Sequence, residues 1–81
     1  MSVIYCTIDM FTRKASICNE DGTAIAVIDV DAIPAILPQY CYSTNVDTVH
    51  FIGFESYVNG IIENMKASTN YKKNSFNIKL N

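Results

Sequence analysis

The sequence has no tryptophan, only three glycines and two prolines, and a single histidine among 81 residues. It also has no apolar run near the ~20 residues that a helix needs to cross a bilayer. Asp9 interrupts the apolar start, which therefore does not resemble a signal peptide. The net charge of −2 provides no positive surplus to bind phosphates. These absences predict a cytoplasmic protein without membrane segments, and they give only weak support to nucleic acid as a partner.

The charged and sulfur-bearing residues also show no site pattern. Cys6, Cys18 and Cys41 are odd in number, and no two have CxxC spacing. A zinc site would need His50 together with these scattered cysteines, so we expect free, mostly buried thiols, as in a reducing cytosol. Four lysines gather near the C-terminus, where we interpret them as a solvated chain end: Lys66, Lys72, Lys73 and Lys79.

Apolar residues make up 49% of the chain, enough for the core of one small domain, residues 1–81. Residues 48–52 form an apolar run typical of a strand buried on both faces, and Gly53 marks a turn. Helical spacing follows over 57–65, with Ser56 placed as its cap. Gly60 inside this helix costs roughly 1 kcal/mol against alanine, which close approach of another backbone would explain.

The first thirty residues predict a three-stranded antiparallel meander. Segments 2–9 and 23–30 are rich in β-branched residues, and 13–18 places Ala15 and Ile17 on one face. Residues 19–22, Asn-Glu-Asp-Gly, predict a tight hairpin, because Asp-Gly tolerates the positive φ that such turns need.

The second half predicts two helices and two strands. Asp31 is placed to cap a helix over 32–42, which Pro38 should kink or shorten. Residues 67–75 are polar and predict a connection. The alternation of Phe76, Ile78 and Leu80 predicts a half-buried final strand.

The resulting order, β-β-β-α-β-α-β, resembles the core of the ribonuclease H-like superfamily. Residues 54–61, FESYVNGI, resemble the segment after the fourth strand of ribonuclease H, roughly Asp-Ser-x-Tyr-Val-x-x-Gly-Ile. Phe54 then stands where the family has a metal-binding aspartate, and Glu55 is one position late. The resemblance implies an α/β fold with two helices and a five-stranded mixed sheet of order 3-2-1-4-5, in which 2–9 and 48–52 run parallel.

Four acidic residues lie at positions where the resemblance implies a catalytic site. Asp9 ends the first strand, Asp29 and Asp31 end the third, and Glu55 follows the fourth, so we expect all four at one edge of the sheet. In a divergent nuclease they would be catalytic and hold Mg²⁺ or Mn²⁺. The alternative is structural, with Asp9 in a turn and with Asp31 and Glu55 at helix starts. The expected first helix has no carboxylate, although active members of the family carry one there.

The aromatic residues allow two interpretations. One set either belongs to the core or forms a protein-binding surface: Phe11, Tyr40, Tyr42, Phe54, Tyr57 and Tyr71. His50, within its strand, is expected to pack as a core histidine.

These patterns favour a non-catalytic protein without cofactor that binds a protein partner or forms a homo-oligomer. The apolar third strand is expected at a sheet edge, where it can pair with a second copy. Eight asparagines suggest an AT-rich genome, for example a phage accessory or inhibitor protein or one from a mobile element. The alternative is the Mg- or Mn-dependent nuclease or resolvase-like enzyme built on Asp9, Glu55, Asp29 and Asp31.

Overall fold

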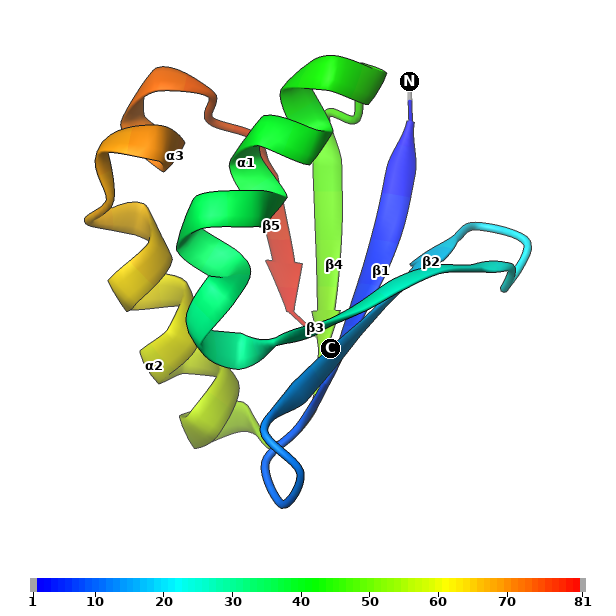
Figure 1. Ribbon diagram of the computed structural model, residues 1–81, viewed down its shortest axis with the longest axis vertical. Coiled ribbons are helices and arrows are strands. Elements are labelled where there is room, and N and C mark those ends of the chain that lie inside the picture. Colours follow the sequence, from blue (N-terminus) through cyan, green and yellow to red (C-terminus); the bar gives the residue numbers. More distant parts are fainter. Residues whose placement is uncertain (1, 81) are drawn as a thin grey trace.

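The computed structural model describes residues 2–80 and consists of one five-stranded sheet with helices against it (Figure 1). The strands are β1 (Val3–Asp9), β2 (Lys14–Asn19), β3 (Ala24–Asp29), β4 (Thr48–Ile52) and β5 (Asn77–Leu80). The helices are the 3₁₀ turn η1 (Val30–Ala32), α1 (Ile33–Thr44), α2 (Glu55–Lys66) and the short α3 (Thr69–Lys73). The sheet order β3-β2-β1-β4-β5 confirms the predicted α/β mixed sheet. The β1–β4 and β4–β5 pairs are parallel, and the β1–β2 and β2–β3 pairs are antiparallel.

The predicted β2–β3 hairpin is confirmed. Gly22 has φ 89°, the conformation that the turn requires of it. The Asn19 N–H donates to the Thr23 carbonyl, and the Asp21 carboxylate accepts from the Thr23 N–H. The register shifts by one residue between Ile17 and Cys18, so β3 carries a bulge near Ala24.

Gly53 marks the closest approach between the central strands and α2. Its φ is 154°, and a Cβ placed there would lie 2.8 Å from the Ile8 carbonyl oxygen and 2.8 Å from Val58 Cγ2. Only a residue without a side chain allows β4 to turn into α2 directly beside β1. The expected turn at Gly53 is therefore confirmed, and it has a steric cause.

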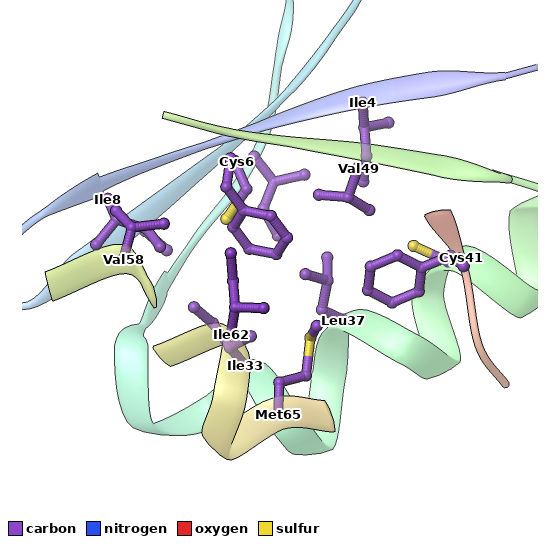
Figure 2. Packing of buried hydrophobic residues seen from close by; sticks show 14 of the residues in the cluster. Ile4, Cys6, Ile8, Ile33, Leu37, Cys41, Val49, Val58, Ile62 and Met65 are labelled. Atoms are coloured by element: carbon purple, nitrogen blue, oxygen red, sulfur yellow. The ribbon is translucent and has the colours of Figure 1, made fainter. Parts of the chain in front are cut away.

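The core is one layer of apolar side chains between the sheet and the helices α1 and α2 (Figure 2). Alternate residues of the strands point into it, and the helices contribute one face each. Its most deeply buried large members include Phe51, Ile4, Ile33, Leu37, Met65, Val49 and Val58.

No helix of the described chain covers the opposite face of the sheet, so two predictions made for β4 are wrong. This strand is covered on one face only, since His50 and Ile52 are half-buried on the other. His50 is therefore not a core residue, and its ring lies beside that of Tyr5 with centroids 5.2 Å apart.

Both predicted helix caps are wrong. Asp31 lies inside η1, and α1 begins after Ala32 instead. Ser56 is the second residue of α2, whose N-cap is Phe54. No side chain within residues 2–80 makes a capping hydrogen bond at either start.

α1 continues through Pro38 for six residues, to Thr44, so the predicted shortening is wrong, whereas the kink given as its alternative stays a prediction. Proline has no N–H to donate to the carbonyl of Pro34, four residues earlier. That carbonyl instead accepts a hydrogen bond from Asn70 Nδ2 of α3, at 3.3 Å. The sequence predicted only a polar connection around Asn70, so α3 is a new element, and it supplies the partner that Pro38 removes.

Two smaller expectations also differ from the structure. Leu80 is exposed, whereas Phe76 is buried and Ile78 packs against the core. Apart from the α2 backbone and chain neighbours, no described atom lies within 4 Å of a Cβ placed at Gly60, so the close backbone expected there is not found. Among the described helices, none is long and apolar enough to cross a membrane.

Candidate functional site

The four predicted acids lie where β1, β3 and β4 end, together with exposed apolar residues. We call the part formed by residues 9–11, 54 and 55 the carboxyl edge; it includes the β1–β2 loop and the β4–α2 turn at the bottom of Figure 1. The parallel pairing of Thr7 with Ile52 places Asp9 and Glu55 at the same end of neighbouring strands, as predicted. Asp29 ends β3, and β2 separates it from β1.

Asp9 holds the β1–β2 loop in shape. Its Oδ1 accepts hydrogen bonds from the backbone N–H of Phe11, at 2.8 Å, and of Thr12, at 3.3 Å. These two bonds hold the pKa of the Asp9 carboxyl below its usual range, since both favour the ionised form. The structural alternative for Asp9, a turn residue, therefore has direct geometric support.

We expect acid to loosen this loop. Because the pKa of Asp9 is lower in the folded than in the unfolded protein, its contribution to stability is present above the unfolded pKa and is lost as pH falls through the folded one. The melting temperature should therefore decrease as the pH is lowered below about 4. Asp9→Ala should lower the melting temperature at neutral pH and flatten part of the acid slope, measured by thermal denaturation across pH.

Asp9→Asn provides the matched control. Asparagine keeps an oxygen that accepts both N–H groups but does not titrate in this range, so it should lose the slope and keep more of the neutral stability. An Asp9→Ala protein with the wild-type pH profile would contradict the assigned role.

Asp29 and Asp31 are each paired with a cation. Lys14 Nζ contacts Asp29 Oδ1, and the hydrogen bond and charge of this lysine lower the pKa of Asp29. Arg13 Nη2 lies 3.0 Å from Asp31 Oδ1 and 3.2 Å from its Oδ2. Both pairs are exposed and contribute little to stability, but they occupy oxygens that a metal would need.

Glu55 is the first residue of α2 and is exposed there, where a carboxylate interacts favourably with the helix dipole. Within residues 2–80, no three His, Cys, Asp or Glu side chains are arranged so that they could hold a metal ion. The carboxyl edge thus brings Asp9 and Glu55 to one end of the sheet without completing a metal-ligand set.

The six aromatic residues divide between the two interpretations. Phe11 is 90% exposed and Phe54 is 63% exposed, both at the carboxyl edge, and Met10 lies beside Phe11. Tyr42 is exposed at the other end of the molecule, where α1 ends. Three pack partly against the core: Tyr40, Tyr57 and Tyr71. The sequence could not separate the exposed aromatic residues from those that pack against the core, because residues of the same type occur in both groups.

A hollow of about 310 Å³ adjoins the carboxyl edge, between α2 and the Arg13–Asp31 pair. Tyr57 and Gly60 both line it. The Tyr57 hydroxyl is shielded from solvent and finds no hydrogen-bond partner among the described residues. Sequence reasoning missed this hollow, since it arises where three separate segments meet.

β3 is the second candidate surface, because it is an edge strand with unprotected backbone groups. The Val30 N–H donates to the Arg13 carbonyl, so by the alternation of antiparallel pairs Ile28 and Ala26 also bond to β2. The N–H and C=O of Val27 and Asp29 therefore point away from the sheet. In the described chain, no strand pairs with that side of β3.

Comparisons with known proteins add no relative to this description. No protein-family model matches the chain, and neither a curated protein nor a solved structure matches it.

Proposed function

We propose that this chain is a small, non-catalytic protein of ribonuclease H-like topology that acts by protein binding, first of all by pairing with a second copy along β3. The observation that carries the proposal is the free edge around Val27, which is 63% exposed. Residues 24–28 contain no charge and no proline, the devices by which proteins usually prevent edge pairing. The other edge strand, β5, has four residues and carries Lys79.

The free groups of β3 define the register of the pair. Val27 of one copy lies opposite Val27 of the second, and the two residues exchange both of their backbone hydrogen bonds. Asp29 then lies opposite Ile25 of the other copy, so no like charges face each other directly. The two sheets join into one continuous sheet around a two-fold axis.

The bulge near Ala24 limits this contact. It leaves only Ala26–Asp29 in regular pairing with β2, so the matching outer edge is short. Contacts of this kind bury less than the roughly 1,200 Å² of standard interfaces and are weak. The dimer should therefore form and dissociate with concentration in the micromolar range.

Val27→Pro should abolish the dimer without unfolding the monomer. Proline removes the outward N–H, and the β2 ladder is preserved because Val27 does not donate to it. Sedimentation or light scattering over a concentration series should show wild-type dimer and a strictly monomeric variant.

Val27→Thr is the matched control, because threonine keeps both the N–H and the β-branched shape. It should dimerise like the wild type. A wild type that stays monomeric at high micromolar concentration, or a Val27→Pro protein that still dimerises, would remove self-association along β3.

The nuclease built on Asp9, Glu55, Asp29 and Asp31 is the second proposal, supported by the shared edge of Asp9 and Glu55. The engagement of Asp9, Asp29 and Asp31 in other contacts supports ranking it below binding. Millimolar Mn²⁺ that stimulates cleavage of RNA, hybrid or branched DNA by wild type but not by Asp9→Asn would reverse the ranking. The three free thiols suit a reducing cytoplasm, and a phage accessory or inhibitor protein is the setting we propose.

A further inference from the structure

The end of the molecule opposite the carboxyl edge is where α1 ends near α3 and the start of β5 (Figure 1). Two hollows of about 570 Å³ and 460 Å³ lie there. Tyr42 and Asn74 line both hollows, which therefore adjoin at these two side chains. We call the two hollows together the Tyr42 groove. Each has a volume in the range of small-molecule sites.

The groove has an apolar floor and an amide rim. Val46 and Phe76, both buried, lie at the floor of the larger hollow. The rim carries the carboxamides of Gln39, Asn45, Asn74 and Asn77. None of these four side chains makes a hydrogen bond to any residue from 2 to 80. Their donors and acceptors are therefore available to a ligand.

Tyr42 provides a flat apolar surface between the hollows. It is 72% exposed although it stands in the last turn of a helix whose other face is core. Nucleobases stack on such rings, and stacking tolerates any base because every base has a π-face. Carboxamides recognise base edges, since they donate and accept at once.

The charges of the groove are separated. Asp47 lines the larger hollow, with its Oδ1 accepting from Thr48 Oγ1 and its second oxygen making no hydrogen bond among residues 2–80. Lys73 lines the smaller hollow, and Lys72 precedes it on α3. A carboxylate accepts from an exocyclic amino group, whereas a lysine binds phosphate. The groove thus has an acidic side at Asp47 and a basic side at Lys73.

We propose that the Tyr42 groove binds one base with its phosphate. The base stacks on Tyr42, its amino group donates to Asp47, and its phosphate contacts Lys73. Adenine, cytosine and guanine carry that amino group, whereas uracil and thymine do not. The net charge of −2 provides no track for a long strand, so the site holds a single unit. This site is separate from β3 and does not depend on self-association.

Titration of the labelled protein with AMP, CMP, UMP and adenosine, followed by NMR amide shifts, tests the proposal. AMP and CMP should shift amides around Tyr42 and bind about fivefold tighter than UMP. Tyr42→Ala should weaken AMP about tenfold or more, whereas Tyr42→Phe keeps the ring and should bind normally. Tyr42 is exposed, so both variants should fold, and far-ultraviolet circular dichroism checks this.

The proposed contact between Lys73 and the phosphate is tested separately. Lys73→Gln should weaken AMP about threefold at low salt and leave adenosine unchanged, while Lys66→Gln on α2 should change neither. A short oligodeoxyadenylate tests whether the site holds a single unit: binding equal to that of AMP supports it, and tighter, salt-sensitive binding would overturn it in favour of a strand. Absence of shifts at millimolar nucleotide, or unchanged binding by Tyr42→Ala, would overturn the proposal.

Discussion

Gly53→Ala is expected to destabilise the protein by about 2–5 kcal/mol, from an added clash and an unfavourable φ together. The new methyl group would lie 2.8 Å from the Ile8 carbonyl oxygen, which belongs to the backbone of the central strand and cannot move alone. Relief requires β4 and α2 to shift away from β1. Since a small domain has about 5–15 kcal/mol in total, urea denaturation should show a much lower midpoint or an unfolded protein.

Gly60→Ala is the matched control, because it adds the same methyl group to open space in the middle of α2. We expect it to stabilise the protein by about 0.5–1 kcal/mol through helix propensity alone. Equal and small effects at both glycines would show that β4 does not pack against β1 as described here.

Native protein is expected to expose one thiol to reagents and to protect two by more than about a thousandfold in rate. Burial raises the pKa of Cys6 and of Cys41 to about 12 each. At about pH 8 roughly 10⁻⁴ of such a thiol is ionised, and only the thiolate reacts. Cys18 is half-buried on the uncovered face of the sheet, where a reagent can approach it.

Titration with a chromogenic disulfide at about pH 8 should therefore release one equivalent quickly and two more only in denaturant. Cys18→Ser should remove the fast phase and leave the slow one. Fast reaction of all three thiols would mean that the core layer between sheet and helices opens readily.

The order of most elements along the chain could be predicted from the sequence because its determinants are local, whereas the strand order within the sheet was an implication of the resemblance. The Asp21-Gly22 turn fixes one hairpin, β-branched residues mark β1, and the apolar run before Gly53 marks β4. The helix starts were predicted wrongly, because several side chains near each start could serve as the cap. Two contacts of α1 and the preceding turn involve residues far away in the sequence: Asp31 pairs with Arg13, and the Pro34 carbonyl accepts from Asn70.

The candidate site, too, was predictable in part: topology gave the position of two acidic residues, but not their side-chain contacts. Topology alone predicted that Asp9 and Glu55 reach one end of the sheet, since both follow parallel neighbouring strands. Their partners depend on side chains that no sequence pattern connects, such as Lys14 with Asp29 across the β2–β3 pair. The edge position of β3 was predicted, whereas the exposure of the Val27 side chain was not, because the sequence does not show which face of the sheet the helices leave uncovered.

The bond from Asn70 to the Pro34 carbonyl affects the order in which the chain can finish folding. A ribosome releases α1 well before it releases α3, so for that interval the first turn of α1 has an acceptor that only water can satisfy. The hydrogen bond to the Pro34 carbonyl can form only after α3 has been synthesised. In a nascent chain halted before Asn70, the Pro34 carbonyl would therefore be bound to solvent instead of to α3.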